Sequence, residues 1–201
     1  MSKKNSSVLN HKELFDRNKR IYSAYTLFKK RVENSKNKPC LVAVSGGSDS
    51  LALAFLAKCY KNETKSKTFF AHVDHGIRKN SRKEAISVKK FLKNFKITLN
   101  ILKNKKEIKK NVQNNARIER YKLLADFCKK KKIPHILTAH HSDDQVETFL
   151  IRLSRGSGVQ GLSSMKTVTQ LEKKIKVIRP LLDLKKKDLS YISKKVFGRF
   201  F

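Results

Sequence analysis

The sequence predicts an α/β domain, a doubly wound parallel sheet with helices on both of its faces. Short apolar runs of strand length alternate along the chain with apolar stripes at helical spacing. Polar or glycine-rich loops separate these runs. Strands and helices that alternate in this way form a parallel sheet, and right-handed crossovers connect the strands.

The first elements are a helix and a strand, loop and helix unit. From His11 to Glu33 apolar residues recur at helical spacing without Gly or Pro, which predicts one leading helix. Pro39 then opens a strand over Cys40 to Val44. The turn-rich segment Ser45 to Ser50 follows, and a helix over Leu51 to Cys59 completes the unit.

The unit repeats through the middle of the chain. Thr68 to Val73 is predicted as the second strand, and a helix begins near Ser81, where Ser81 and Glu84 have the spacing of a capping box. The later elements are a third strand at Ile97 to Leu102, a basic connection at Lys103 to Lys110, a helix at Val112 to Lys132, a fourth strand at Ile133 to Thr138, a helix at about Asp143 to Ser154, a strand at Lys176 to Arg179 and a lysine-rich helix after Leu182.

The expected organisation is one α/β domain at 38–182, preceded by a helical segment at 1–37 and followed by a basic tail at 183–201. No apolar stretch approaches the roughly 20 residues that a membrane span requires, and the polar first residues lack the apolar middle of a secretory signal. We therefore expect a cytoplasmic protein without a membrane partner. The pattern says nothing about oligomeric state.

The net charge and the cysteines limit the classes of function that the sequence allows. The formal net charge of +32 produces a positive field that attracts polyanions such as nucleic acid, although a lysine-rich composition can also reflect the drift of a genome. Cys40, Cys59 and Cys128 are far apart and form no C-x-x-C pair, which argues against disulfides and against a zinc or iron–sulfur site. We interpret them as buried thiols.

The loop Ser45 to Ser50 carries the first chemical signal. It lies where a strand leads into a helix, so backbone amides and the helix N-terminus can bind an anion. Gly46 and Gly47 permit a close approach of the backbone, but two glycines alone are also typical of an ordinary turn. Because ligands of parallel sheets bind beyond the carboxyl ends of the strands, the loops after the first, second and fourth strands should meet in space.

Two further loops carry polar residues. His72-Val73-Asp74-His75-Gly76-Ile77-Arg78 follows the second strand and could bind metal or nucleotide, or be only a polar loop. After the fourth strand, Ser142 and Gln145 form a capping pair, yet capping does not explain His140 and His141. Nor does it explain a polar face of Asp144, Glu147 and Thr148 opposite the apolar stripe Val146, Phe149, Leu150 and Leu153. Such a face suits carboxylates that bind Mg²⁺ or a substrate ammonium.

Arginines complete the candidate set. Arg155 precedes glycines that stop the helix, and it could also contact a phosphate. Arg117 and Arg120, next to Tyr121, lie on a predicted helix and could form only a solvated face.

Six motifs, SGGSDS, HVDHGIR, ARIERY, TAHHSDDQVETFL, RLSRGSGVQGL and RPLL, together resemble the catalytic domain of the tRNA(Ile)-lysidine synthetase family. The resemblance covers about Lys38 to Leu182, and SGGSDS looks like the loop of the N-type ATP pyrophosphatases (the PP-loop superfamily). It implies a ligase that adenylates the wobble cytidine of an isoleucine tRNA with a CAU anticodon, releases pyrophosphate, and replaces AMP with free L-lysine.

The resemblance also implies roles for individual residues. By this resemblance ATP is the substrate, and its β and γ phosphates are held by Ser45, Gly46, Gly47, Ser48, Asp49 and Ser50, with Asp49 and Asp144 as candidate Mg²⁺ ligands. Asp74 and His75 lie near the nucleotide. The catalytic candidates are Asp49, His141, Asp144 and Glu147, of which the last three bind lysine or metal. The candidates for phosphate or RNA contact are Arg78, Arg117, Arg120 and Arg155.

Two alternatives stay open. The chain could be another PP-loop enzyme that adenylates tRNA, or a truncated RNA-binding remnant without catalysis. The family usually continues beyond the point that corresponds to Phe201 into domains that bind tRNA, so a minimal enzyme, a truncated product and a fragment are all compatible with the sequence.

Overall fold

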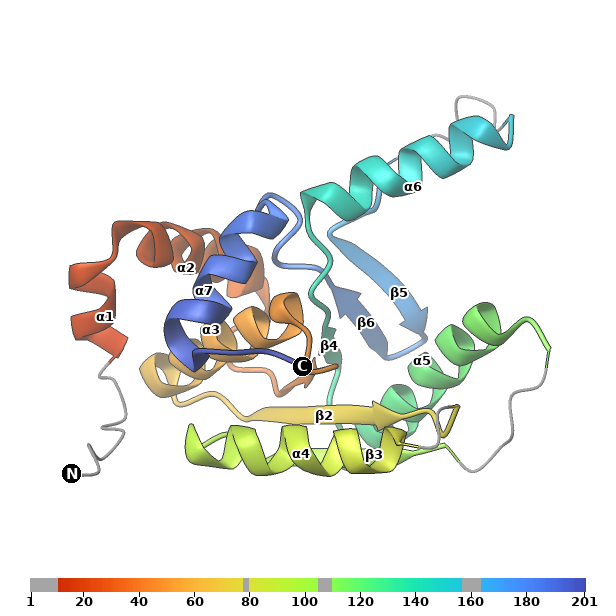
Figure 1. Ribbon diagram of the computed structural model, residues 1–201, viewed down its shortest axis with the longest axis horizontal. Coiled ribbons are helices and arrows are strands. Elements are labelled where there is room, and N and C mark those ends of the chain that lie inside the picture. Colours follow the sequence, from red (N-terminus) through yellow and green to blue (C-terminus); the bar gives the residue numbers. More distant parts are fainter. Residues whose placement is uncertain (1–10, 78–79, 105–109, 157–163) are drawn as a thin grey trace.

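A six-stranded sheet forms the centre of the molecule. The computed structural model describes residues 11–77, 80–104, 110–156 and 164–201 (Figure 1). The strands are β1 (Cys40–Ala43), β2 (Thr68–Asp74), β3 (Leu99–Lys103), β4 (His135–Leu137), β5 (Val168–Glu172) and β6 (Ile175–Ile178). Their order across the sheet is β3-β2-β1-β4-β6-β5, and only the pairing of β5 with β6 is antiparallel. The prediction of a parallel α/β sheet is confirmed.

Helices cover both faces of this sheet. They are α1 (His11–Arg17), α2 (Lys19–Val32), a 3₁₀ turn (Glu33–Ser35), α3 (Ser48–Thr64), α4 (Ser81–Asn94), α5 (Val112–Lys131), α6 (Ser142–Ser154) and α7 (Lys186–Phe197). Alternate residues of β1 enter two separate apolar clusters. Val42 packs with α2, α3, α4 and α7 on one face, and Leu41 packs with α5 on the other. The period of two along the strand therefore builds both halves of the core.

The leading helix differs from its prediction. It is broken at Asn18, whose side chain accepts a hydrogen bond from the Ile21 backbone N–H at 3.1 Å. Asparagine is among the preferred N-cap residues, so it ends α1 and starts α2 although the apolar spacing continues across the break. The predicted capping box of Ser81 is also wrong, because Asn80 is the N-cap of α4 and Ser81 already lies in the helix.

Helix α6 departs from its prediction in two ways. His141 rather than Ser142 precedes the helix, and the carboxylate of Asp144, not Gln145, accepts a hydrogen bond from the His141 backbone N–H at 2.8 Å. The apolar stripe is exposed, since Val146, Phe149, Leu150 and Leu153 keep 42–59% of their surface in contact with solvent among the described residues. Figure 1 shows the helix projecting from the body of the domain.

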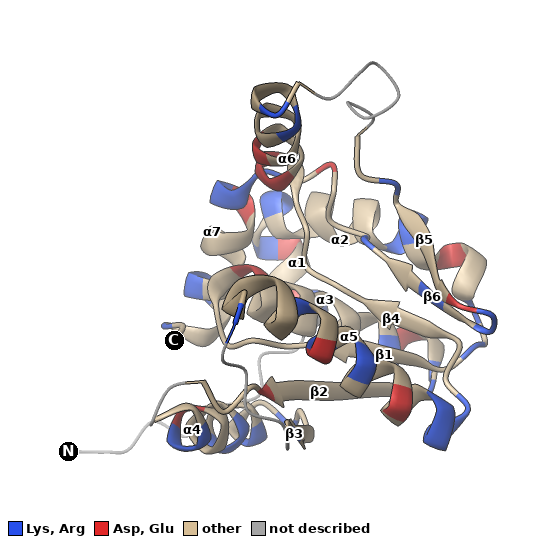
Figure 2. Ribbon diagram, turned by 90° about the vertical axis from the view of Figure 1, so that its right-hand side faces the viewer, with Lys and Arg blue, Asp and Glu red and all other residues tan. Residues whose placement is uncertain are grey.

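Helices α2 and α7 share the central core. Phe28 of α2 and Ile192 of α7 are fully buried in the same cluster as Val42. The division into 1–37, 38–182 and 183–201 stays a prediction. None of the helices in the described ranges is long and apolar enough to cross a membrane. Figure 2 shows that Lys and Arg are spread over many outer elements.

Candidate functional site

A cleft of about 770 Å³ opens at the carboxyl ends of β1, β2 and β4. The loops that follow these three strands all contribute to its lining, as the sequence predicts. From the loop after β1 (residues 45–50, the 45–50 loop) come Ser45, Gly47, Asp49 and Ser50. The end of β2 and the loop after it supply Asp74 and His75, α5 supplies Arg120 and Tyr121, and the loop after β4 and the start of α6 supply His140 and Asp144. The volume lies in the range of clefts that hold small ligands.

The buried hydroxyl of Ser50 shapes the 45–50 loop. The backbone N–H groups of Ser45 and Gly46 both donate to Ser50 Oγ at 3.1 Å. Ser50 Oγ itself lies 2.9 Å from the Gly47 carbonyl oxygen, to which it donates. Gly46 adopts φ +102°, a conformation that side chains oppose. These bonds fold the loop back on the first turn of α3, so the amides of residues 45 and 46 serve the loop itself.

The amides that remain for a ligand belong to the first turn of α3. Gly47 is the N-cap residue, and the first amide with a helical acceptor is that of Leu51, which donates to the Gly47 carbonyl at 3.0 Å. Within the described part of the chain, no acceptor is recorded for the N–H groups of residues 48–50. Free amides at a helix N-terminus, together with the helix dipole, bind anions such as phosphate.

Two carboxylates flank a buried imidazole beside this turn. Nε2 of His141 lies 3.6 Å from Oδ2 of Asp49 and 3.6 Å from Oδ2 of Asp144. His141 is 5% exposed, and both carboxylates line the cleft. The structure therefore brings together three of the four predicted catalytic side chains, with His141 beneath the cleft rather than on its wall.

The histidines that line the cleft are held in their uncharged form. Burial, reinforced by Arg179, lowers the pKa of His140 to about 4. Burial also lowers the pKa of His72, whose Nδ1 lies 2.9 Å from the Val44 carbonyl oxygen. The pKa of His75 is lowered by burial and by the neighbouring Arg120, whose Nε donates to His75 Nε2 at 3.4 Å. At neutral pH these rings contribute polar atoms but no positive charge.

Asp74 closes the side of the cleft that follows β2. It is 3% exposed, and its carboxylate accepts a hydrogen bond from the Gly76 backbone N–H at 3.2 Å. The guanidinium of Arg82 lies 4.0 Å away. The described residues that line the cleft include four carboxylates, on Asp49, Asp74, Glu84 and Asp144, against the single guanidinium of Arg120.

Several predicted residues lie away from the cleft. Glu147, on α6, and Arg155, the C-cap residue that follows this helix, are both exposed and do not line the cleft. Arg117 also stays outside the lining, with its guanidinium 5.4 Å from the ring centre of Tyr121. Arg78 and the segment 157–163 lie outside the described residues. Conversely, Glu84 lines the cleft although the sequence pattern does not indicate it, because its spacing from Ser81 suggests a capping box instead.

The residues present fit a magnesium ion only in combination with phosphate. In the described ranges, no group of three or more His, Cys, Asp or Glu side chains is arranged to hold a metal ion. Magnesium is usually held by one or two carboxylates, with substrate phosphates and water as the other ligands. Asp49 and Asp144 would supply the two carboxylates, next to the amides that would hold the phosphates.

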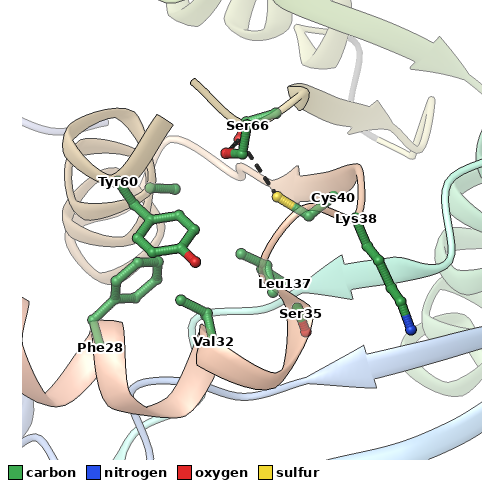
Figure 3. A pocket seen from close by; sticks show the side chains of 10 residues that line it. Phe28, Val32, Ser35, Lys38, Cys40, Tyr60, Ser66 and Leu137 are labelled. Carbon is green, nitrogen blue, oxygen red and sulfur yellow. Dashed lines mark hydrogen bonds between the residues drawn. The ribbon is translucent and has the colours of Figure 1, made fainter. Parts of the chain in front are cut away.

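A second cavity lies at the opposite, amino end of β1. Figure 3 shows Phe28, Tyr60, Cys40 and Leu137 around it, and its volume is about 10 Å³. That is about the space of one water molecule, so it is no ligand site. The three cysteines are free and buried, as predicted.

A mostly parallel α/β sheet with the N-terminus of a helix open at its carboxyl edge is typical of Rossmann-like nucleotide-binding domains. Comparison with known families agrees with this class and identifies a particular family within it. The family model described as "PP-loop domain" matches residues 21–200, so the chain belongs to the PP-loop domain family.

Curated relatives with the name tRNA(Ile)-lysidine synthase match most of the chain. The chain is 42% identical to the tRNA(Ile)-lysidine synthase of Wolbachia pipientis wMel. The match extends over 173 residues, which are 84% of this chain and 40% of the relative. It is 40% identical to the synthase of Orientia tsutsugamushi, over 77% of this chain and 35% of the relative. It is 39% identical to the synthase of Zymomonas mobilis, over 77% of this chain and 47% of the relative. The chain thus spans less than half the length of the curated relatives it matches.

Solved structures support the fold. The U34-tRNA thiolase NcsA from Methanococcus maripaludis superposes with a TM-score of 0.76 at 20% identity, over 90% of this chain and 65% of that chain. The NH₃-dependent NAD synthetase from Campylobacter jejuni superposes with a TM-score of 0.53 at 17% identity, over 89% and 72%. The thiolase carries a [4Fe-4S] cluster, whereas the cysteines of this chain are buried and dispersed.

Proposed function

We propose that this chain is the catalytic part of a tRNA(Ile)-lysidine synthase. It would use ATP to adenylate the wobble cytidine of a CAU-anticodon isoleucine tRNA and then join free L-lysine to the same base, in the cytoplasm. The observation that carries the proposal is the cleft in which the first-turn amides of α3 open beside Asp49, His141 and Asp144. The lysidine synthase name of relatives about 40% identical narrows the chemistry.

The cleft suits the first step, cleavage of ATP to AMP and pyrophosphate. The amides of residues 48–50 and the dipole of α3 stabilise negative charge on the pyrophosphate leaving group. Asp49 and Asp144 would hold Mg²⁺ together with the phosphates. That ion would supply the positive charge that the phosphates need, because the four carboxylates of the lining are negative. His75 and Asp74 would border the rest of the nucleotide.

The cleft also suits the second step, in which an amine attacks the ring carbon of the adenylated base and AMP leaves. Free lysine enters as an ammonium ion, and an acidic lining attracts it. The amine reacts only after it has lost a proton. A carboxylate of the lining that does not hold Mg²⁺ can hold the ammonium and accept that proton.

Incorporation of radiolabelled lysine tests the function. The purified chain is incubated with ATP, Mg²⁺, labelled lysine and a tRNA with a CAU anticodon, and a tRNA with another anticodon is the control. We expect lysine-dependent AMP formation and label in the CAU tRNA alone. AMP formation without lysine transfer would favour another PP-loop tRNA adenylase, whereas tRNA retention without AMP formation would favour an RNA-binding remnant.

A variant of Asp49 tests the site. Asp49→Asn should abolish the release of pyrophosphate from ATP and leave tRNA binding largely intact, because the substitution removes one carboxylate beside the phosphates and keeps the shape of the side chain. Asp126→Asn, an exposed residue of α5 outside the cleft, is the matched control. Unchanged pyrophosphate release by Asp49→Asn would contradict the assignment of the loop.

A further inference from the structure

Helix α7 carries a buried hydroxyl at a position where its apolar stripe calls for a hydrocarbon side chain. Leu189, Ile192 and Phe197 of this stripe are buried in the central core, and Ser193 lies among them with 0% exposure. Serine is a weaker helix former than alanine, and a buried hydroxyl needs a partner. A serine inside a helix commonly bonds the carbonyl four residues earlier. Ser193 instead donates to the carbonyl oxygen of Ser48, in the first turn of α3.

The acceptor of this bond lies in the turn that opens to the cleft. The carbonyl of Ser48 and the N–H of Asp49 belong to one planar trans peptide unit, so they point in opposite directions. Ser48 is the first residue of α3, so its carbonyl points along the helix and the Asp49 N–H points back toward the helix N-terminus, and the bond from Ser193 holds this peptide in that orientation. This N–H is one of the amides without a recorded acceptor in the described part of the chain.

Other contacts tie α7 and the residues after it to both sides of the cleft. Ser190 Oγ lies 3.4 Å from Ser48 Oγ, and the Phe201 backbone N–H donates to the Gly46 carbonyl at 3.0 Å. At the start of α7 the Lys186 backbone N–H donates to the carboxylate of Asp143 at 3.3 Å. Asp143 lies next to Asp144 at the start of α6. Helix α7 thus spans the distance between the 45–50 loop and the turn that carries His141 and Asp144.

We propose that Ser193 is a positioning residue for the anion site, which orients the Ser48–Asp49 peptide so that its N–H faces the triphosphate. The inference rests on the proposed function, because it assumes that ATP binds at this turn. Ser193 touches no substrate, and it acts through the backbone of Ser48. Loss of the hydroxyl should leave the fold intact but allow the peptide to rotate, which weakens binding of the phosphates.

The test compares Ser193→Ala with Ile192→Val in the full chain. Both changes remove a small group from a fully buried side chain of α7, and both should lower the melting temperature by a similar few degrees. Only the first removes the bond to Ser48. Calorimetric titration with ATP and Mg²⁺ should give a Kd about three- to tenfold higher for Ser193→Ala and an unchanged Kd for Ile192→Val. The Kd for adenosine, which has no phosphates, should be the same for both variants.

The outcomes separate the two proposals. An equal Kd for ATP in Ser193→Ala, Ile192→Val and the unaltered chain would overturn the role of Ser193 and leave the proposed function standing. An unaltered chain that binds no ATP would overturn both. If Ser193→Ala fails to fold, Ser193→Cys is measured in its place, because a thiol fills a similar space but is only a weak donor to the Ser48 carbonyl, and a smaller increase of the same sign is expected. No increase in that variant would count against the proposal.

Discussion

Removal of the Ser50 hydroxyl should damage the anion site more than its size suggests. Ser50 Oγ is the acceptor for the backbone N–H groups of Ser45 and Gly46 and a donor to the Gly47 carbonyl. Ser50→Ala removes these bonds together and adds no bulk. The Gly46 N–H is buried, so in the variant it is left without a partner, whereas the Ser45 N–H can turn to water.

The magnitude follows from this difference. A buried donor without an acceptor costs ~1–3 kcal/mol, and the exposed one adds little. A loss of about 2 kcal/mol should lower the melting temperature by roughly 4–8 °C in a chain of this size. If returning the loop of the variant to its binding conformation costs about 1.4 kcal/mol of binding free energy, the Kd for ATP rises about tenfold.

The assay is a thermal melt together with calorimetric titration of ATP and Mg²⁺. Thr64→Ala is the matched control, because Thr64 Oγ1 donates to the Tyr60 carbonyl at 2.7 Å in the last turn of the same helix, far from the cleft. It should leave the Kd for ATP unchanged. Ser50→Ala with the melting temperature and the ATP affinity of the unaltered chain would refute the view that this hydroxyl organises the loop.

Two further predictions follow from the site. Gly46→Ala should weaken ATP binding, because φ is +102° and the new Cβ would lie 2.9 Å from Val88 Cγ2. Gly46→Ala combined with Val88→Ala relieves only the contact, so titration should show partial recovery, and full recovery would exclude backbone strain of the expected ~1–3 kcal/mol. The second prediction concerns pH. Burial lowers the pKa of His140 to about 4, so the unfolded chain, with the ordinary value of about 6.5, binds more protons within that window, and stability falls as the pH drops through it. The loss of melting temperature between pH 7 and pH 5 should be smaller in His140→Asn, and an unchanged loss would exclude His140 as a contributor.

The sheet and the place of the cleft could be predicted because both depend on local patterns. The apolar run at Cys40 to Val44 and the helical spacing after Ser81 each specify one element, and the topology of parallel strands then places three polar loops at one edge. The antiparallel strand β5 carried no such signal. Val168 is exposed and the strand is only partly buried, so its sequence lacks the apolar alternation that marks a strand with one face in the core.

The details of the site depend on contacts between distant segments, which spacing cannot show. Capping of α6 by Asp144 follows from the backbone position of His141, and Ser142 with Gln145 matched the sequence pattern equally well. The stripe Val146 to Leu153 indicates correctly which residues share a face but not whether anything covers them. Ser193 gave no signal at all, since its role arises from a partner 145 residues away along the chain.

The net charge of +32 does not show that the cleft and the outer surface of the chain carry different charges. Among the described residues, the lining of the cleft has more carboxylates than cations, and its histidines are held uncharged, so the positive field originates on the outer elements. A field of that origin attracts a long polyanion to the surface, as binding of tRNA requires. A triphosphate inside an acidic cleft instead needs oriented amides and a divalent cation, while an ammonium substrate is favoured there without further help. The proposed function would therefore place tRNA on the outer surface and Mg²⁺, ATP and lysine in the cleft, because opposite charges are kept on different surfaces of the described part of the chain.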